Sequence, residues 1–212
     1  SIRNPFTSVK MRLFSLERTL ELSDSQQEDF DVISEEIRHI DTIVQNFLEF
    51  SRPPKLAMQP ISPSAVVDTV VQLLSHRLKS YEVTLTTARS EALPLVNADP
   101  DQLKEVLVNL IINACEAMGK GGTIVIEELV SRKPSGFPEA VIRICDNGPG
   151  IPASLRAKVF EPFFTTKEEG TGLGLSIAKR IINEHKGWLD IAETEGCGAT
   201  VVVTLPIKEP SA

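Results

Sequence analysis

Residues 99–118 read DPDQLKEVLVNLIINACEAM, and this stretch decides how the rest of the chain must fold. Asp99-Pro100 predicts a helix start, because Asp is a good N-cap and Pro fits the first turn. The apolar residues that follow recur at helical spacing through Met118 and form one face: Leu103, Val106, Leu107, Leu110 and Ile111. Such a face has to be covered by other elements, so the stretch predicts a packed core.

The same helix carries two asparagines, Asn109 and Asn113, one turn apart and therefore on one face. Two interpretations are open. The pair can be a structural hydrogen-bonding pair. Alternatively, its amide oxygens can bind Mg²⁺, which prefers carboxylate, amide and phosphate oxygens.

The segments on either side of this helix predict an α+β sandwich, with a mixed sheet that has helices on one face. Ser62-Pro63 predicts the start of an earlier helix. β-branched runs bounded by Gly and Pro predict four strands, at roughly Thr123–Val130, Ala140–Asp146, Gly187–Glu193 and Ala199–Leu205.

Residues 146–151 read DNGPGI and follow one of these strands directly. The Asp146 carboxylate at a strand end can accept a hydrogen bond from an exocyclic amine, and glycines let the backbone approach a planar ring. A plain Asp-Asn-Gly turn is the alternative interpretation of the fragment taken alone.

Residues 160–167 read FEPFFTTK, and residues 170–175 read GTGLGL before a helix that continues to about His185. Alternating glycines at a helix start expose several backbone N–H groups at the positive end of the helix dipole, which suits a phosphate. The run is not the dinucleotide fingerprint, because position 175 is Leu, and no Gly-Lys-Ser/Thr of a Walker A loop follows. The His-Arg-Asp and Asp-Phe-Gly motifs of serine/threonine/tyrosine kinases are absent from the sequence.

The N-terminal part predicts two helices whose apolar residues alternate at steps of four and three. The first helix runs to about Leu22, and Ser25 with Glu28 has the form of a capping box that opens the second. Pro53-Pro54 ends the second helix, which predicts a hairpin over residues 1–54 and a second domain over residues 55–212. A hairpin with one narrow apolar seam cannot bury it alone, so we expect a homodimeric four-helix bundle. The seam residues are Ile2, Phe6, Val9, Leu13, Leu16, Leu20, Phe30, Ile33, Ile37, Ile40, Val44 and Phe47.

Composition excludes several classes of function. The net charge of −7 argues against nucleic acid or anionic lipid as a partner of the whole chain. The longest apolar stretch, Val106–Ile112, is short and interrupted by Asn109, so no membrane span is expected, and membrane attachment would need an upstream segment. The three cysteines, Cys115, Cys145 and Cys197, show no C-x-x-C spacing, which argues against zinc and favours a reducing, cytoplasmic compartment. We expect all three to be small core or near-core residues.

Taken in order, the Asn109/Asn113 pair, the Asp146 motif, the Phe-rich segment, the Gly170–Gly174 run and residues 196–200 resemble the N, G1, F, G2 and G3 boxes of histidine kinase catalytic domains. The resemblance covers roughly Ile61 to Ile207. The hairpin resembles the family's dimerisation and histidine-phosphotransfer domain, and Ile2-Arg3-Asn4-Pro5 is similar to the tail of its histidine box.

This resemblance implies a site for ATP and Mg²⁺. It assigns Asn113 and Asn109 to the metal, Asp146 to the adenine amine, and Gly148 and Gly150 to the purine pocket. It makes residues 147–173 a lid anchored by Phe160, Phe163 and Phe164, with Lys167 reaching the terminal phosphates and Thr200 near the base. The rest of the expected nucleotide-binding set is Gly170, Thr171, Gly172, Leu173, Gly174 and Leu175, and the candidate catalytic residues are Asn109, Lys167 and Asn4.

The resemblance also implies transfer of the ATP γ-phosphate to a histidine and onward to an aspartate of a response regulator. Related ATPases that hydrolyse ATP resemble one another in placing a glutamate where this chain has Asn109, and an amide cannot act as a general base. The family pattern places the acceptor one position before Ser1, and this 212-residue chain is therefore not expected to label itself. His39 is expected to be a partly exposed structural histidine, and His76 and His185 to be helix-surface residues. Two rival functions remain, a dimeric nucleotide-binding scaffold without transfer and a serine kinase of the anti-sigma-factor type.

Overall fold

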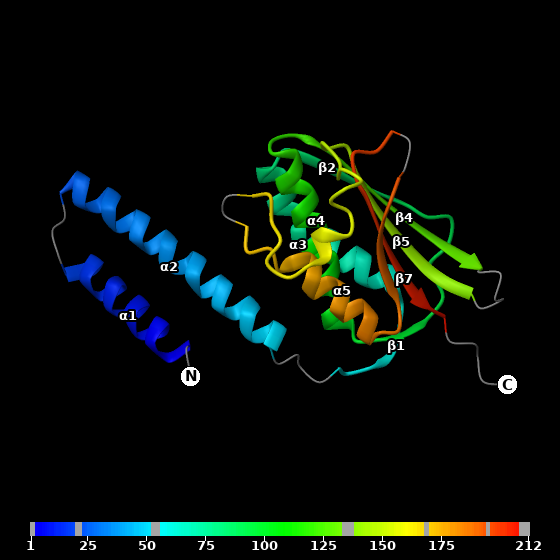
Figure 1. Cartoon of the computed structure of the whole chain (residues 1–212), viewed down its shortest axis with the longest axis horizontal. Helices are drawn as coiled ribbons and strands as arrows, with labels where there is room; N and C mark the ends of the chain where they lie inside the picture. The colour runs from blue at the N-terminus through cyan, green and yellow to red at the C-terminus, as the bar shows by residue number, and fades with distance from the viewer. Residues whose placement is uncertain are drawn as a thin grey trace. The chain divides into compact units, whose positions relative to one another are not determined.

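The computed structural model describes residues 3–19, 23–51, 56–132, 138–167, 170–193 and 196–207 (Figure 1). The chain divides into two compact units, Ser1–Pro54 and Lys55–Ala212.

The first unit contains two helices, α1 (Arg3–Thr19) and α2 (Asp24–Ser51). The sequence had indicated a capping box of Ser25 with Glu28, but the start of α2 is capped two residues earlier, by Ser23 and Gln26. The backbone N–H and the hydroxyl of Ser23 both donate to Gln26 Oε1, at 3.0 Å. The bond from the Ser23 N–H to a Gln side chain three residues later is one half of a capping box.

The apolar seam of these two helices is only partly covered within one copy of the chain. Val9 is 46% exposed, and Leu16 and Ile33 are each 48% exposed. Leu13, Phe30 and Ile37 are half-buried. Large apolar side chains left open along one stripe are the feature expected of helices that pack against a further partner.

The second unit is built on a five-stranded mixed sheet in the order β2-β4-β5-β7-β6. Only the β2–β4 pair is parallel. The strands are β2 (Val83–Ala88), β4 (Gly122–Arg132), β5 (Pro138–Asp146), β6 (Trp188–Ala192) and β7 (Thr200–Pro206). The α+β architecture predicted from the sequence is confirmed.

Three helices cover one face of this sheet, α3 (Pro63–Ser80), α4 (Pro100–Met118) and α5 (Gly174–Glu184) (Figure 1). The predicted caps of α3 and α4 are confirmed, because Ser62 accepts from the Ala65 N–H and Asp99 accepts from Asp101 and Gln102. The apolar face of α4 is buried, and Val106, Leu107 and Ile111 are at most 1% exposed. This helix therefore forms the centre of the core, as its sequence predicted.

Sequence patterns missed three strands. Strands β1 (Gln59–Ile61) and β3 (Val96–Ala98) pair with each other in a separate antiparallel ribbon, and strand β2 lies at an edge of the main sheet. Three residues are too few to establish a period of two. In β2, the run from Val83 is rich in threonine and mostly exposed, so it lacks the apolar alternation that marks a strand.

A polar cluster ties α3 to the sheet. The Arg89 guanidinium lies 2.7 Å from Asp68 and 2.9 Å from Glu128, whose side chain is fully buried. Ser64 donates to Glu128 and accepts from the Leu93 N–H at 2.8 Å. The hydrogen bond to Asp68 is the main cause that raises the pKa of Arg89, and burial opposes it. A buried carboxylate is tolerated here because both a cation and a hydroxyl satisfy it.

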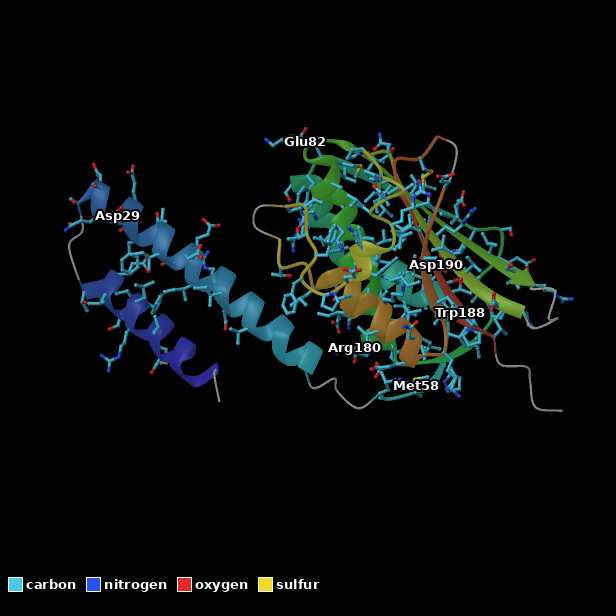
Figure 2. The ribbon with its side chains drawn as sticks, in the orientation of Figure 1. Asp29, Met58, Glu82, Arg180, Trp188 and Asp190 are labelled. Carbon is cyan, nitrogen blue, oxygen red and sulfur yellow. A yellow bond between two sulfur atoms is a disulfide. The ribbon has the colours of Figure 1, made fainter. Side chains whose placement is uncertain are left out.

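The edge of the sheet formed by β6, at the other end from β2, is open to solvent. Strand β6 carries Trp188, which is 47% exposed, and the exposed Asp190 (Figure 2). Among the helices of the described ranges, none has both the length and the apolarity needed to span a bilayer.

Candidate functional site

A cavity of about 70 Å³ lies where α4 and α5 meet the ends of β5 and β7. Four residues expected in the nucleotide site line it, Asn113, Asp146, Gly150 and Leu175. The rest of the lining is mostly apolar and consists of Leu110, Ala114, Ala117, Ile144, Ile151, Ala199 and Val201. An apolar enclosure with a few convergent polar groups is typical of a small-molecule site.

Asp146 is the charged group of this cavity. It ends β5, and it is 6% exposed. Its Oδ1 accepts hydrogen bonds from the backbone N–H of Gly148 at 2.9 Å and of Ala199 at 3.1 Å. Its Oδ2 has no hydrogen-bond partner among the described residues. The carboxylate is thus held in place through one oxygen, and the other oxygen remains able to accept.

Next to this carboxylate, two backbone segments approach each other so closely that glycine is required at the points of contact. A Cβ on Gly150, whose φ is +77°, would collide with Gly198 O, and a Cβ on Gly198 would collide with Gly148 O. Positive φ alone disfavours other residues at position 150. We call Asp146, Gly148, Gly150, Gly198 and Ala199 the Asp146 clasp. Sequence reasoning assigned roles to three of its members, whereas Gly198 and Ala199 belonged to the motif at residues 196–200 without a role of their own.

Helix α4 contributes one polar side chain to the cavity lining, that of Asn113. Asn113 lines the cavity, and Asn109, one turn earlier, is half-buried outside the lining. Lys167 Nζ lies 2.6 Å from Glu116 Oε2 and 3.5 Å from Asn113 Oδ1. Lys167 and Asn113 are therefore brought together, as expected. Glu116 was missed, although its position three residues after Asn113 places it on the same face of the helix.

The glycine run leads into α5 beside Asn113. Gly172, at φ +65°, packs so closely on the backbone of Phe163 that a Cβ could not be accommodated, and Leu173 is fully buried. The Thr171 hydroxyl accepts from the Leu173 N–H at 3.4 Å. A Cβ on Gly174, the first residue of α5, would lie 3.7 Å from Asn113 Nδ2. The positive end of the α5 dipole therefore lies next to Asn113.

The expected aromatic anchors of the lid differ in burial. Phe160 is half-buried, and Lys179 Nζ lies 4.1 Å from the centre of its ring. Phe164 is also half-buried. Phe163 does not act as an anchor in this structure, because its side chain is 58% exposed and its backbone adopts a positive φ of 67°. Its tight contact with Gly172 is made through the backbone and not through the ring.

The expectation that His185 is a surface residue is wrong. His185 is 2% exposed, its Nδ1 lies 2.7 Å from Ile181 O, and its Nε2 accepts from the Asp99 N–H at 2.9 Å. This arrangement requires a neutral imidazole with its proton on Nδ1. The end of α5 is thereby joined to the start of α4. His76 is exposed, as expected.

Asp99 joins a third segment to these two helices. Its Oδ2 accepts from the Ala57 N–H at 2.7 Å, and its Oδ1 accepts from Asp101 and Gln102 at 3.0 and 3.2 Å. Burial opposes ionisation of Asp99, yet these backbone donors, with Ala57 the strongest, hold its pKa below the ordinary value.

The expectation that all three cysteines are small core or near-core residues is confirmed for Cys115, but it missed the bond between the other two. Cys115 is a buried free thiol, but Cys145 and Cys197 form a disulfide. These two residues are 52 positions apart in the sequence, and they meet because β5 pairs antiparallel with β7. Local spacing cannot reveal such a pair. Thr200 lies three residues after Cys197, at the start of β7. It is 1% exposed, it is not part of the cavity lining, and its Oγ1 has no partner among the described residues.

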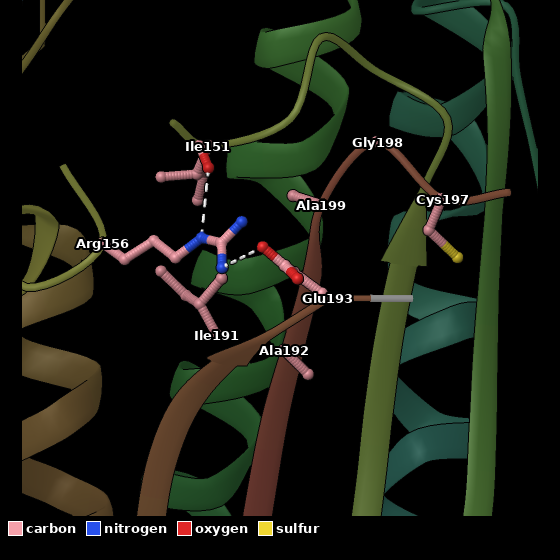
Figure 3. Close-up of a pocket in the computed structure, with 8 residues that line it drawn as sticks. All are labelled: Ile151, Arg156, Ile191, Ala192, Glu193, Cys197, Gly198 and Ala199. Carbon is pink, nitrogen blue, oxygen red and sulfur yellow. Dashed lines mark hydrogen bonds and ion pairs between the residues drawn. The ribbon is translucent and has the colours of Figure 1, made fainter. Parts of the chain in front are cut away.

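A larger cavity of about 420 Å³ shares Ile151 and Ala199 with the first (Figure 3). Arg156 and Glu193 are the charged residues of its lining. The Arg156 Nε donates to Ile151 O at 3.3 Å, and the Arg156 guanidinium lies 2.7 Å from Glu193. This cavity contains neither Asp146 nor the asparagines, so we assign the chemistry to the smaller one.

Two predictions concern side chains outside the described residues. Asn4 belongs to α1 and His39 to α2, but the placement of neither side chain is described.

Comparison with known proteins agrees with this geometry. Residues 98–209 match the family described as histidine kinase-, DNA gyrase B- and HSP90-like ATPases, and residues 1–55 match the His Kinase A (phospho-acceptor) domain. The sensor histidine kinase ZraS of Salmonella typhi is 35% identical over 97% of this chain and 43% of its own length. For the histidine-protein kinase AtoS of Escherichia coli, the values are 39%, 98% and 33%. The chain thus spans less than half of these relatives.

Two solved structures extend the likeness to the fold. Full-length ShkA in complex with AMPPNP matches with a TM-score of 0.81 and 26% identity, over 100% of this chain and 45% of ShkA. ThkA in complex with the response regulator TrrA matches with a TM-score of 0.73 and 27% identity, over 98% of this chain and 59% of its counterpart. The motifs, the fold and these matches together show that the chain belongs to the family of two-component sensor histidine kinases.

Proposed function

We propose that this chain binds ATP with Mg²⁺ in the cavity beside Asp146 and serves transfer of the γ-phosphate to a histidine, and from there to an aspartate of a response regulator. The observation that carries the proposal is the Asp146 carboxylate, with one oxygen fixed by backbone donors and the other free to accept. The AMPPNP that accompanies the relative ShkA supports a nucleotide as the ligand.

The adenine end of the site is assigned to Asp146. The exocyclic amine of the base donates to Asp146 Oδ2, and the apolar residues Leu110, Ile144 and Ile151 contact the ring. Because Gly148 and Gly150 carry no side chain, the adenine ring can lie directly against the backbone at these positions. Thr200 supplies a buried hydroxyl close to this end, where it can bind a water molecule.

The phosphate end is assigned to Asn113, Asn109 and Lys167, with Gly170, Thr171 and Gly172 leading to α5. Amide oxygens and phosphate oxygens form a donor set that suits Mg²⁺, which neutralises phosphate charge when bound. Lys167, already 3.5 Å from Asn113, moves from Glu116 to the terminal phosphates. Gly174 and Leu175 start α5, whose positive dipole end attracts the same phosphates.

Transfer is favoured over hydrolysis by the type of residue that lies one turn before the assigned metal ligand Asn113. Asn109 occupies the position one turn before Asn113, and an amide cannot take a proton from water. Positioning of an acceptor then determines where the phosphate goes.

The hairpin is assigned to dimerisation and to the phosphate acceptor, and the division of the chain into two units falls after Pro54. The match of residues 1–55 to a phospho-acceptor domain and the open seam at Val9, Leu16 and Ile33 support this assignment. We place the acceptor histidine one position before Ser1 and give Asn4 a role beside it. The complex of the relative ThkA with the response regulator TrrA supports a receiver domain as the next acceptor.

The test is incubation with γ-labelled ATP of two chains, the 212-residue chain and one that includes the native residues preceding Ser1. Phosphohistidine is labile in acid and stable in alkali, and phosphoserine behaves in the opposite way. Acid-labile label on the longer chain alone, passed on to an added receiver domain, is the expected result. Acid-labile label on the shorter chain that vanishes in His39→Gln would contradict the assigned acceptor. Acid-stable label would favour a serine kinase, and ATP binding without any label would favour a scaffold.

A further inference from the structure

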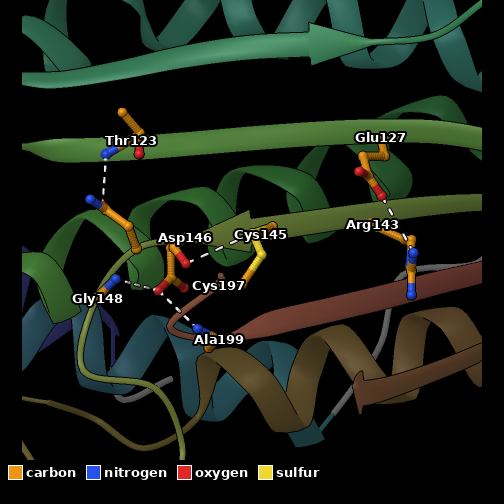
Figure 4. Close-up of a disulfide and its surroundings, with 9 residues drawn as sticks. Thr123, Glu127, Arg143, Cys145, Asp146, Gly148, Cys197 and Ala199 are labelled. Carbon is orange, nitrogen blue, oxygen red and sulfur yellow. Dashed lines mark hydrogen bonds and ion pairs between the residues drawn. A yellow bond between two sulfur atoms is a disulfide. The ribbon is translucent and has the colours of Figure 1, made fainter. Parts of the chain in front are cut away.

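The Cys145–Cys197 disulfide lies directly next to the Asp146 clasp (Figure 4). Cys145 precedes Asp146 at the end of β5, and Cys197 precedes Gly198 in the segment before β7. The two Cα atoms are 5.9 Å apart, which is the separation that a disulfide requires. The covalent bond therefore joins the two segments that form the clasp, one residue away from it on each side.

Hydrogen bonds also hold these two segments together at this point, beside the glycine-to-glycine backbone contact. The Gly198 N–H donates to Asp146 O at 2.6 Å, the Asp146 N–H donates to Ala199 O at 3.0 Å, and the Ala199 N–H donates to Asp146 Oδ1 at 3.1 Å. The last of these bonds orients the carboxylate itself. Movement of the segment around Gly198 would thus change the direction of the group that we assign to the adenine amine.

Cys145 lies on the face of the sheet opposite the cavity. Side chains alternate along β5, so Ile144 and Asp146 face the helices, and Arg143 and Cys145 face the other way. Arg143 is partly exposed and lies 3.4 Å from Glu127 on that face. Cys145 and Cys197 are both half-buried. The pair is therefore partly exposed to thiol reagents, and neither cysteine lines the smaller cavity.

We propose that Cys145 and Cys197 are a reversible thiol–disulfide modification site whose oxidation state sets the nucleotide affinity of the Asp146 cavity. The proposal rests on the assignment of this cavity to ATP. Its reaction partners are thiol reductants and small disulfide oxidants. In compartments that keep most thiols reduced, disulfides of this kind are usually transient and redox-sensing.

The exchange with a thiol reductant is balanced as follows. The reductant's thiolate attacks one sulfur of the disulfide, the bond between the two cysteine sulfurs breaks, and the released cysteine thiolate takes a proton from water. A second reductant thiolate then attacks the reductant's sulfur in the mixed disulfide, the bond to the remaining cysteine sulfur breaks, and the cysteine thiolate released also takes a proton from water. The protein gains two electrons and two protons, and two reductant thiols become one disulfide. A small disulfide reverses each step.

Reduction is expected to weaken ATP binding. With the bond open, Gly198 and Ala199 are held beside Asp146 by hydrogen bonds and by backbone packing against Gly148 and Gly150, and Asp146 loses part of its preorganisation. We expect the Kd for ATP to rise about three- to tenfold on reduction, which corresponds to the loss of about one ordinary hydrogen bond.

The experiment measures the Kd for Mg·ATP of the whole chain by calorimetry, after treatment with excess dithiol and after treatment with a small disulfide. Mass spectrometry follows the gain or loss of two hydrogens. The variants Cys145→Ser and Cys197→Ser remove the pair. Cys115→Ala is the matched control, because Cys115 is the buried free thiol of α4 and burial raises its pKa, which keeps it unreactive.

The expected result is a three- to tenfold weaker Kd on reduction in the wild type and in Cys115→Ala. The two serine variants are expected to keep the weaker Kd under both treatments. Equal Kd values for the oxidised and reduced wild type would overturn the proposal, and so would failure of the folded chain to form the bond. A chain that changes mass as expected but binds no ATP in either state would instead contradict the proposed function.

Discussion

The two ends of the assigned nucleotide site are constructed in different ways. At the adenine end, Asp146 is held by backbone donors, by glycine-to-glycine backbone contact and by an adjacent disulfide. At the phosphate end, Lys167 is held by a partly exposed ion pair with Glu116, and Phe163 is exposed. A preorganised end binds with little loss of entropy, whereas a loosely held end can rearrange around the group that is transferred. We infer that affinity is set mainly at the first end and transfer at the second.

The largest effect is expected for Asp146→Asn, which keeps the shape of the clasp and removes its charge. Oδ1 can still accept from Gly148 and Ala199, but the amide NH₂ then faces the adenine amine. Loss of one charge-assisted hydrogen bond costs about 1.5–3 kcal/mol, so ATP affinity should fall roughly 10- to 150-fold in calorimetry. Asp190→Asn on the open edge strand is the control for charge. Unchanged affinity in a folded Asp146→Asn variant would remove the basis for a rigid adenine end.

A comparison of two glycine substitutions is expected to give the next largest effect. Gly150→Ala places a Cβ at a positive φ and against Gly198 O, and such strain costs about 1–3 kcal/mol. The unfolding temperature should then fall by roughly 2–10 °C. Gly174→Ala, at the phosphate end, meets only an ordinary contact at 3.7 Å and should leave the unfolding temperature nearly unchanged. Equal effects of the two substitutions would mean that the clasp is no more rigid than the other end.

Loss of a metal ligand should separate the two ends in a second way. Asn113→Ala is expected to reduce the enhancement of ATP affinity by Mg²⁺ by about tenfold, which corresponds to one strong polar contact, without changing affinity measured in a chelator. Asn183→Ala, an exposed position near the end of α5, is the control. If Asn113→Ala keeps the full Mg²⁺ enhancement, the asparagine pair is structural. A separate variant, Asn109→Glu, should hydrolyse ATP slowly but faster than the wild-type chain.

The smallest effect concerns the ion pair that holds Lys167 without ligand. Glu116→Gln removes the competing carboxylate, and partly exposed pairs contribute about 0.2–1 kcal/mol, so ATP should bind up to about fivefold more tightly. Glu127→Gln, which affects a similar pair on the opposite face of the sheet, should have no effect. Weaker binding in Glu116→Gln would mean that Glu116 itself takes part in holding the metal or the nucleotide.

The sequence predicted the elements that have strong local signals. Ser62-Pro63 and Asp99-Pro100 marked helix starts within one residue, because a capping side chain and a proline act over a few positions. The apolar run of α4 predicted its burial, and the order of the glycine and asparagine motifs led to the cavity that Asn113, Asp146, Gly150 and Leu175 line.

The features that were missed depend on contacts between distant segments. His185 follows the amphipathic helix α5, yet it is buried because its ring bridges to Asp99, 86 positions earlier in the chain. Cys145 meets Cys197 only through the pairing of β5 with β7. Glu116 contacts Lys167, which lies 51 positions later in the chain. No local period or spacing encodes such meetings, so they appear only once the fold is known.

Asp99 gives the second unit a point of mechanical attachment. The chain enters this unit at Leu56, and the Ala57 N–H is held at 2.7 Å by the same carboxylate that caps α4, while the Asp99 N–H is bonded to His185. Tension on the entering chain is therefore passed to the ends of two helices, before it reaches the short ribbon of β1 and β3. Because the pKa of Asp99 is lowered, its carboxylate stays charged at neutral pH. The hydrogen bonds that it accepts weaken only as the pH falls through that lowered pKa.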